Sequence, residues 1–274
     1  MVTVARQRAW AAMAIGLALF ACQKKPDEPA KTAGPPATVA PLGYANTGDG
    51  VQVTMTLPEP IKLYPELHTR LYSEGESNLV AFMATAAKDH AEMAADGFPV
   101  ADYYRKIDWK IAAQSPKLVS LYAETEDFQG GAHPGHDFQA LLWDKSKSEL
   151  IPTGKLFTTG ADMSAVDAYA CRQIEALRSK RAREPVRQAD FGGGCPRFAE
   201  AKLILIPSTV SGKVGAVDAL FAPSEVGAYA EGPYEIRVPQ TVLTGVLNPE
   251  FADQFAGDPV VENALPDPDA EIAR

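Results

Sequence analysis

Alternating hydrophobic and polar positions predict several β-strands in this chain. Between residues 51 and 57 every second residue is apolar, which is the pattern of a strand with one buried face. The same reasoning predicts strands at about 106–111, 117–128, 136–144, 203–206, 214–221 and 234–238. The second, third and fourth strands of this series are joined by short connections. They are expected to form an antiparallel meander, because a parallel pair needs a crossover of about a dozen residues or more.

Two other stretches carry apolar residues at helical spacing and therefore predict amphipathic helices. The first covers about 76–95 and is followed by a Gly-Phe-Pro sequence that ends a helix. The second covers about 162–181, where Asp162 is suited to cap the first turn. Strands and helices are segregated along the chain and do not strictly alternate. We therefore expect an α+β fold with antiparallel sheets and the two main helices packed on one face.

The composition is that of a globular protein, since 46% of the residues are hydrophobic and 22% are charged. Asp and Glu number 35 against 26 Lys and Arg, and the net charge of −9 argues against nucleic acid as a partner. The length of 274 residues allows one folded domain at about 44–257, or two subdomains at about 44–160 and 161–257.

The N-terminal residues have the features of an export signal. Two arginines precede a short apolar run at 11–20. Leu19 is a poor −3 residue for ordinary signal peptidase, whereas the sequence Leu-Phe-Ala-Cys at 19–22 resembles a bacterial lipobox. We therefore expect 1–21 to be a lipoprotein signal peptide and Cys22 to carry the lipid that holds the protein on a membrane. The alternative is a plain signal peptide in which Cys22 has no such role.

Both ends of the expected domain are flanked by segments that are poor in core-forming residues. Residues 22–43 are rich in Pro, Ala and Lys and are expected to form a flexible linker. Residues 258–274 contain prolines among acids and are expected to form a loose acidic tail. Gln23 follows Cys22, and by its similarity to Gram-negative sorting signals it favours the outer membrane, with the protein facing the periplasm.

Two cysteines, Cys171 and Cys195, remain once Cys22 is assigned to the lipid. In an oxidising compartment such a pair is expected to form a disulfide. A redox or metal pair is the alternative, but their separation matches no CxxC or zinc pattern. We therefore expect a structural Cys171–Cys195 bridge.

The residues with catalytic or metal-binding chemistry do not complete a known motif. His133 and His136 lie on a turn, and no further ligand pattern completes a metal site, so neither a metal nor a cofactor is expected. Glu124 and Glu126 share one face of a strand and could act as a glycosidase pair, although such spacing is common on solvated strands. The alternative enzyme hypothesis is an envelope hydrolase that uses His133 with Glu124 or Asp137.

Basic residues cluster near the end of the second predicted helix. They are Arg172, Arg178, Lys180, Arg181, Arg183 and Arg187. Cations at a helix C-terminus are favoured by the helix dipole, and this explanation is sufficient. Binding of an anionic wall polymer or a lipid headgroup is the alternative.

Two sequence motifs carry a resemblance to a known family. The first is Gly-Gly-Ala-His-Pro at 130–134, followed by a strand and by Leu-Ile-Pro-Thr-Gly-Lys-Leu-Phe at 150–157. The second is Tyr-Ala-Glu-Gly-Pro at 229–233, directly before the last strand. Over about residues 50–250 the chain resembles the domain shared by two groups of proteins. These are the ectodomains of RsiV-type lysozyme-sensing anti-sigma factors and the N-terminal regions of PdaC-type peptidoglycan deacetylases.

The resemblance implies an extracytoplasmic α+β domain without catalytic residues of its own. The implied function is a non-catalytic binding domain, with a cell-wall glycan or a wall-acting protein such as lysozyme as its ligand. The residues expected to bind are Gly130, Gly131 and His133 on the loop, with Tyr122 and Glu124 on the preceding strand. The alternative for His133 is that it only holds the loop in place through hydrogen bonds. Adjacent glycines allow a partner to approach the backbone closely, and loops on a rigid sheet often carry binding residues.

Overall fold

The computed structural model describes residues 39–97, 99–191, 194–260 and 263–265. The expected signal peptide at 1–21, the expected lipid-bearing Cys22 and most of the expected linker lie outside the described residues. No helix in the described part of the chain is long and apolar enough to cross a membrane.

The first sheet contains six strands in the order β1-β2-β3-β4-β5-β6. Their bounds are β1 Gly43–Gly48, β2 Val51–Thr56, β3 Tyr103–Gln114, β4 Leu118–Phe128, β5 Gly135–Asp144 and β6 Glu149–Ile151. The expected antiparallel meander is present as β3, β4 and β5. β2 and β3 are parallel, contrary to the all-antiparallel expectation, because the 31-residue helix α1 (Pro65–Ala95) connects them and returns the chain to the same end of the sheet.

The hairpin of β1 and β2 adds a strand, β1, that was not predicted, at the start of the expected domain. β1 has few apolar residues, so its alternation is weak. Asp49 and Gly50 form its two-residue turn, with positive φ angles of 52° and 72°. A Cβ atom on Gly50 would lie 2.4 Å from Cε1 of His90 on α1. Glycine is therefore required at this position both by the positive φ of the turn and by the packing of the turn against α1.

Helix α1 begins at Pro65, well before the expected start near residue 76. Its buried side chains include Leu67, Leu71 and Phe82, which pack on β2 and β3. Gly75 lies directly against Met55 of β2, because a Cβ there would be 2.2 Å from the methionine sulfur. The close approach of helix and strand therefore depends on a residue that lowers helix propensity.

The second sheet is antiparallel and has three strands in the order β7-β8-β9. These are β7 Lys202–Pro207, β8 Val214–Phe221 and β9 Tyr234–Pro239, as the alternation predicted. Helix α2 (Ser164–Ala182) covers this sheet, and Asp162 accepts a hydrogen bond from Ser164 N at its start. Short helices complete the described elements: η1 Glu59–Leu63, η2 Thr153–Leu156, η3 Gln188–Phe191, η4 Phe198–Glu200, η5 Tyr229–Glu231, α3 Gln240–Leu243 and α4 Pro249–Ala252.

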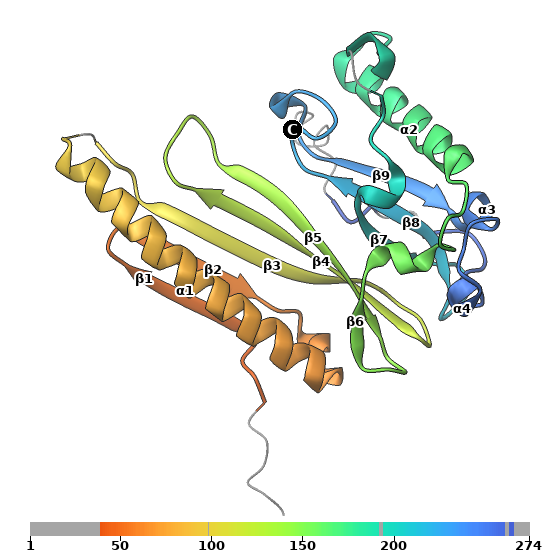
Figure 1. Cartoon of the computed structure of the whole chain (residues 1–274), viewed down its shortest axis with the longest axis horizontal. Helices are drawn as coiled ribbons and strands as arrows, with labels where there is room; N and C mark the ends of the chain where they lie inside the picture. The colour runs from red at the N-terminus through yellow and green to blue at the C-terminus, as the bar shows by residue number, and fades with distance from the viewer. Residues whose placement is uncertain (1–38, 98, 192–193, 261–262, 266–274) are drawn as a thin grey trace, which may run out of the picture. The chain divides into compact units, whose positions relative to one another are not determined.

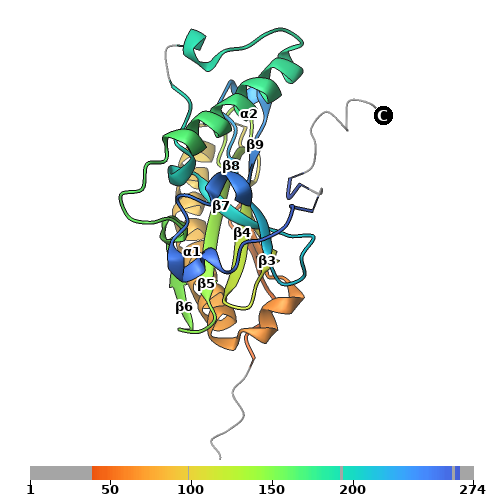
Figure 2. The same ribbon diagram turned by 90° about the vertical axis from the view of Figure 1, so that its right-hand side faces the viewer.

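The α+β class is confirmed, and each sheet carries one of the two main helices. Figures 1 and 2 show α1 and α2 on opposite sides, with the two sheets between them. The helices therefore do not share a sheet face, because each amphipathic helix buries its apolar stripe on a separate sheet.

Three apolar clusters hold these layers together. One lies between α1 and the six-stranded sheet and includes Val53, Leu79 and Leu121. Another lies between the three-stranded sheet and α2 and includes Ile174. The third joins the two sheets and includes Tyr122 and Phe138 from the first and Ile204 and Leu220 from the second. Burial of this kind stabilises the fold by about 25 cal/mol for each Å² of apolar surface removed from water.

The described residues of the expected loose tail are held against the domain. Asp258 O accepts a hydrogen bond from Thr209 N, and Val260 N donates to Pro207 O beside β7. Ala264 N and Leu265 N both donate to the carboxylate of Glu235 on β9. Leu265 is itself buried. These residues are held in place because their backbone groups form hydrogen bonds with the second sheet. The local composition does not reveal such bonds.

A disulfide joins Cys171 on α2 to Cys195, with the two Cα atoms 5.4 Å apart. It closes a loop between residues separated by 24 positions. Replacing both cysteines by alanine is expected to lower the free energy of unfolding by about 3 kcal/mol without unfolding the domain. Urea denaturation measures this, and reduction of the wild-type protein is the matched comparison. If both thiols react with an alkylating agent in the absence of reductant, the bridge is not present in solution.

Candidate ligand-binding groove

A groove with a cavity volume of about 420 Å³ lies between the two sheets. Its floor is the face of β3, β4 and β5 that points away from α1. The strand register places Lys106, Glu126 and His136 in one row, and Asp108, Glu124 and Phe138 in the next. Alternation along a strand puts every second side chain on one face, so these two rows form one continuous surface.

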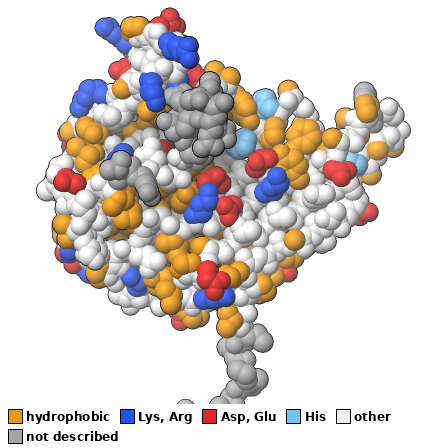
Figure 3. Space-filling view, turned by 180° about the vertical axis from the view of Figure 1, so that it is seen from behind, with side chains coloured by type: hydrophobic (Ala, Val, Ile, Leu, Met, Phe, Trp, Pro, Cys, Tyr) orange, Lys and Arg blue, Asp and Glu red, His pale blue; other side chains and the backbone are white. Residues whose placement is uncertain are grey.

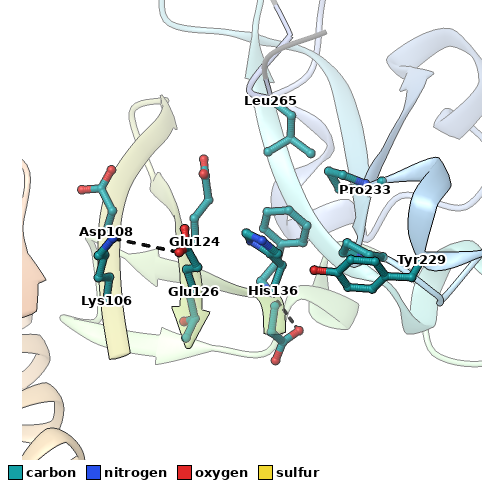
Figure 4. A pocket seen from close by; sticks show the side chains of 13 residues that line it. Lys106, Asp108, Glu124, Glu126, His136, Tyr229, Pro233 and Leu265 are labelled. Carbon is teal, nitrogen blue, oxygen red and sulfur yellow. Dashed lines mark hydrogen bonds and ion pairs between the residues drawn. The ribbon is translucent and has the colours of Figure 1, made fainter. Parts of the chain in front are cut away.

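The other side of the groove is formed by residues of the second half of the chain. Pro223, Tyr229 and Pro233 come from the connection between β8 and β9, and Leu265 comes from the C-terminal segment. Figure 4 shows Tyr229, Pro233 and Leu265 across from the side chains of β3 to β5. The groove thus combines a polar floor with an opposite side made of apolar and aromatic groups.

Carboxylates dominate the charge of the floor. Lys110 Nζ lies 2.6 Å from Glu124 Oε1 and 3.6 Å from Asp108 Oδ2. Lys106 Nζ lies 4.0 Å from Glu126 Oε1. Asp137 is a further acid in the lining, so the acids outnumber the lysines. Figure 3 shows histidine, acidic and basic side chains gathered beside hydrophobic ones on the face turned to the viewer.

Two tyrosines on this face of the sheet form hydrogen bonds through their hydroxyl groups. Tyr104 donates a hydrogen bond to Glu126 Oε1 at 2.5 Å, and this bond to a carboxylate raises the pKa of Tyr104 to about 12. Tyr122 is buried on the same face of β4, one row beyond Glu124, and donates to Ala264 O at 3.2 Å. Burial is the main cause that raises the pKa of Tyr122. Both phenols therefore stay neutral at physiological pH and act as hydrogen-bond donors.

The Gly130–Gly131 loop is fixed at the edge of the groove by Tyr229. Both glycines have positive φ, 84° and 109°. The His133 ring stacks on the Tyr229 ring with centroids 3.7 Å apart and an interplanar angle of 20°. The Tyr229 hydroxyl donates to Pro134 O at 2.5 Å. The two sequence motifs, which are far apart in the chain, therefore contact each other.

The turn that carries Tyr229 is held by arginines of α2. Arg178 makes two hydrogen bonds to the Glu231 carboxylate, at 2.9 and 2.8 Å. Arg181 donates to the backbone oxygens of Glu231 and Pro233. The pairing with Arg178 lowers the pKa of Glu231 to about 2. Part of the basic cluster at the end of α2 therefore has a structural role that the helix dipole does not explain.

The structure places the expected site residues in different parts of this region. Glu124 and Asp137 line the groove, and Tyr122 is buried next to Glu124 on the same face of β4, outside the lining. His133 and the two glycines lie outside the lining, with His133 stacked on Tyr229, whereas His136 is in the lining. The lining residues Lys106, Asp108 and Leu265 were not anticipated. Strand alternation signals the first two, but only the register shows that they lie beside the glutamates.

The pairing required by the hydrolase hypothesis is not seen among the described residues. His133 Nδ1 lies 3.1 Å from Pro134 O, and no hydrogen bond in the described part joins His133 to Glu124 or Asp137. Asp137 accepts a hydrogen bond from Phe138 N and lies 3.8 Å from Lys202. Within the described ranges, no group of three His, Cys, Asp or Glu side chains is arranged to hold a metal ion.

Comparison with known proteins places part of this chain near a known family. Residues 45–136 match the family described as deacetylase PdaC. This match covers about a third of the chain and includes β2, α1, β3, β4 and the whole loop at 129–134 that carries Gly130 and Gly131. No curated protein matches the sequence.

Two solved structures of the DUF3298 family are similar to this chain. A member from Bacteroides fragilis has a TM-score of 0.52 at 14% sequence identity, covering 74% of this chain and 88% of that one. A DUF3298 family protein from Pseudomonas aeruginosa has a TM-score of 0.47 at 17% identity, covering 78% of this chain and 94% of that one. The first similarity indicates a shared fold.

Proposed function

We propose that this chain is a lipid-anchored, non-catalytic binding domain of the cell envelope whose groove binds a saccharide of the cell wall. The observation that carries the proposal is the groove itself. It combines an open row of carboxylates on β3 to β5 with Tyr229 and Phe138 in one lining. Concave sites with a few convergent polar groups among apolar ones are typical of ligand binding.

The chemistry of the lining suits a sugar. Carboxylates accept hydrogen bonds from hydroxyl groups, and such charge-assisted bonds are about twice as strong as neutral ones. The half-buried ring of Tyr229 and the apolar rings of Pro223 and Pro233 offer surfaces for the C–H face of a sugar. The excess of acids disfavours an anionic polymer and suits a neutral or amine-bearing glycan.

Replacing Glu126 by glutamine tests this proposal, because it keeps the shape of the side chain and removes one charged acceptor. We expect the affinity for soluble peptidoglycan fragments to fall about tenfold. Isothermal titration with muropeptides measures the effect. The matched control is Glu74→Gln, which removes an exposed carboxylate on α1, outside the groove lining, and should leave affinity unchanged.

Three results would contradict the proposal. The first is equal binding by wild type and Glu126→Gln, and the second is the absence of any muropeptide binding by the wild type. The third is turnover of wall fragments by the wild type that disappears in His133→Ala, because this would establish the hydrolase instead.

A wall-acting protein with a basic surface, such as lysozyme, is the second candidate partner. Asp108 and Asp137 are exposed at the groove, and the chain carries a net charge of −9. A protein partner of this kind would show binding that weakens steeply with salt, since screening acts on exposed charges. Titration of lysozyme at low and moderate ionic strength, beside the muropeptide series, separates the two candidates.

The proposed location rests on the N-terminal sequence. Replacing Cys22 by alanine is expected to abolish lipidation and to release the protein from the membrane fraction, because the proposed lipid chains are all attached to this one residue. Mass spectrometry of the detergent-extracted wild type should detect acyl chains on Cys22, and fractionation should place the protein in the outer membrane. An unmodified soluble wild type that starts near residue 22 would refute the anchor.

A further inference from the structure

Three residues near the C-terminus, 263–265, lie between two cavities and are called the strap below. Leu265 is buried and lines the groove described above. Asn263 and Ala264 instead line a separate cavity of about 270 Å³. Consecutive residues therefore face different cavities, so the strap forms the boundary between them.

The two cavities are neighbours on one face of the first sheet. Glu124 of β4 lines the groove, and Tyr122, two residues earlier on the same face, lines the second cavity. The register places Lys110 of β3 and Ala140 of β5 beside Tyr122. This row is therefore the direct continuation of the groove floor, next to the row that contains Glu124.

Hydrogen bonds hold the strap to both sheets at this point. The Tyr122 hydroxyl of β4 donates to Ala264 O at 3.2 Å. From the other side, Ala264 N and Leu265 N donate to the carboxylate of Glu235 on β9 at 2.9 and 2.8 Å. Bonds to a carboxylate are stronger than neutral ones. Leu265 also belongs to the apolar cluster that contains Tyr122 and Phe138. The strap is therefore a fixed part of the space between the sheets.

We propose that the strap closes this end of the groove, so that the groove accepts short saccharides or the ends of longer chains. The inference rests on the proposed function and adds the length of the ligand. A saccharide that lies along the floor meets Leu265 after the row of Asp108 and Glu124. It cannot continue to the Tyr122 hydroxyl, because this group is buried and already bonded to Ala264.

A chain that ends at residue 263 tests the inference, because it lacks Ala264 and Leu265. Calorimetry with peptidoglycan glycans of two, four and six sugars measures how affinity depends on length. In the wild type, the six-sugar glycan should bind no more tightly than the four-sugar one. The shortened chain should bind the six-sugar glycan about tenfold more tightly than the wild type does, since the Tyr122 hydroxyl becomes available for a further hydrogen bond. The affinity for the two-sugar glycan should change by about twofold or less.

A second variant releases the strap in a chain of full length. Leu265→Asp places a charge in the apolar cluster, and the cost of burying it should expel the strap. Faster hydrogen exchange at Ala264 reports the release, and the same gain for the six-sugar glycan is expected. This variant carries the test if circular dichroism shows that the shortened chain is unfolded. The matched control is a chain that ends at residue 268, which keeps the strap and should bind like the wild type.

The possible results separate this inference from the proposed function. If the wild type binds the short glycans and both variants show the same length dependence as the wild type, the inference is overturned and the proposed function stands. An equal gain in the chain that ends at residue 268 would also overturn the inference, because the strap is present there. Absence of binding by every form would overturn the proposed function and the inference together.

Discussion

Replacing Arg178 by alanine is expected to lower the free energy of unfolding by about 3 kcal/mol. The side chain is 7% exposed and bonds both oxygens of Glu231, so its removal leaves a partly buried carboxylate without its main partner. Because Glu231 also holds Ala228 N and the Tyr234 hydroxyl, the turn that carries Tyr229 should loosen. Urea denaturation measures the stability, and the affinity for muropeptides measures the effect on the groove.

The pH dependence of stability provides an independent readout of the same pair. The pKa of Glu231 is about 2 in the folded protein, below its ordinary value of 4.5. A lowered pKa contributes stability that is complete above pH 4.5 and is lost as the pH falls toward 2. Arg178→Ala should remove most of this dependence, and Arg178→Lys should retain part of it, since lysine keeps the charge but not the paired geometry.

Arg172→Ala is the matched control, because Arg172 is an exposed arginine on the same helix. Its loss should change the free energy of unfolding by about 0.5 kcal/mol or less. If Arg172→Ala and Arg178→Ala destabilise the protein equally, the effect belongs to the helix charge and the specific pair with Glu231 is unimportant.

Replacing Asp218 by alanine is expected to destabilise the protein by about 3 kcal/mol as well. Asp218 is fully buried on β8, where Arg237 Nε and Nη2 donate to its carboxylate at 2.8–3.1 Å. Arg237 also donates to Val260 O, and neighbouring Glu235 holds Ala264 and Leu265. The substitution should therefore release the C-terminal segment from the second sheet. Hydrogen exchange at residues 260, 264 and 265 detects this release alongside the loss of stability.

Asp253→Ala provides the control for this second substitution. Asp253 is an exposed acid that pairs with Lys117 at 3.0 Å, and surface pairs of this kind contribute about 1 kcal/mol or less. Fast exchange at residues 260 and 264 in the wild type, equal to that in Asp218→Ala, would contradict the docking of the segment.

The first helix illustrates where prediction from the sequence stops. The apolar stripe from Leu79 onward predicts a helix, but the residues before it include His68 and Gly75, which interrupt the pattern. His68 is buried, and its Nε2 has a partner in Pro41 O at 2.9 Å, so a polar residue is accepted on the buried face. Gly75 permits close contact between the helix and Met55. Both reasons lie in segments distant in sequence, so local periodicity could not reveal the first turns of α1.

The groove shows the same limit. Alternation places Glu124 and Glu126 on one face of β4, and the two motifs around His133 and Tyr229 stand out as sequence patterns. Their contact depends on how the two sheets pack together. His133 lies on the loop between β4 and β5 of the first sheet, whereas Tyr229 lies between β8 and β9 of the second. His133 stacks on Tyr229 beside the groove, and its expected role in binding stays a prediction.

The sequence by itself determined most strands, the second helix, the α+β class and the cysteine pair, because these depend on local alternation, helical period and composition. Only the tertiary structure decided that β2 and β3 are parallel and that each sheet carries its own helix. It also decided that Arg178 pairs with Glu231 and that Glu235 holds the C-terminal segment. These features depend on side chains brought together from distant positions, where packing and burial outweigh local propensity.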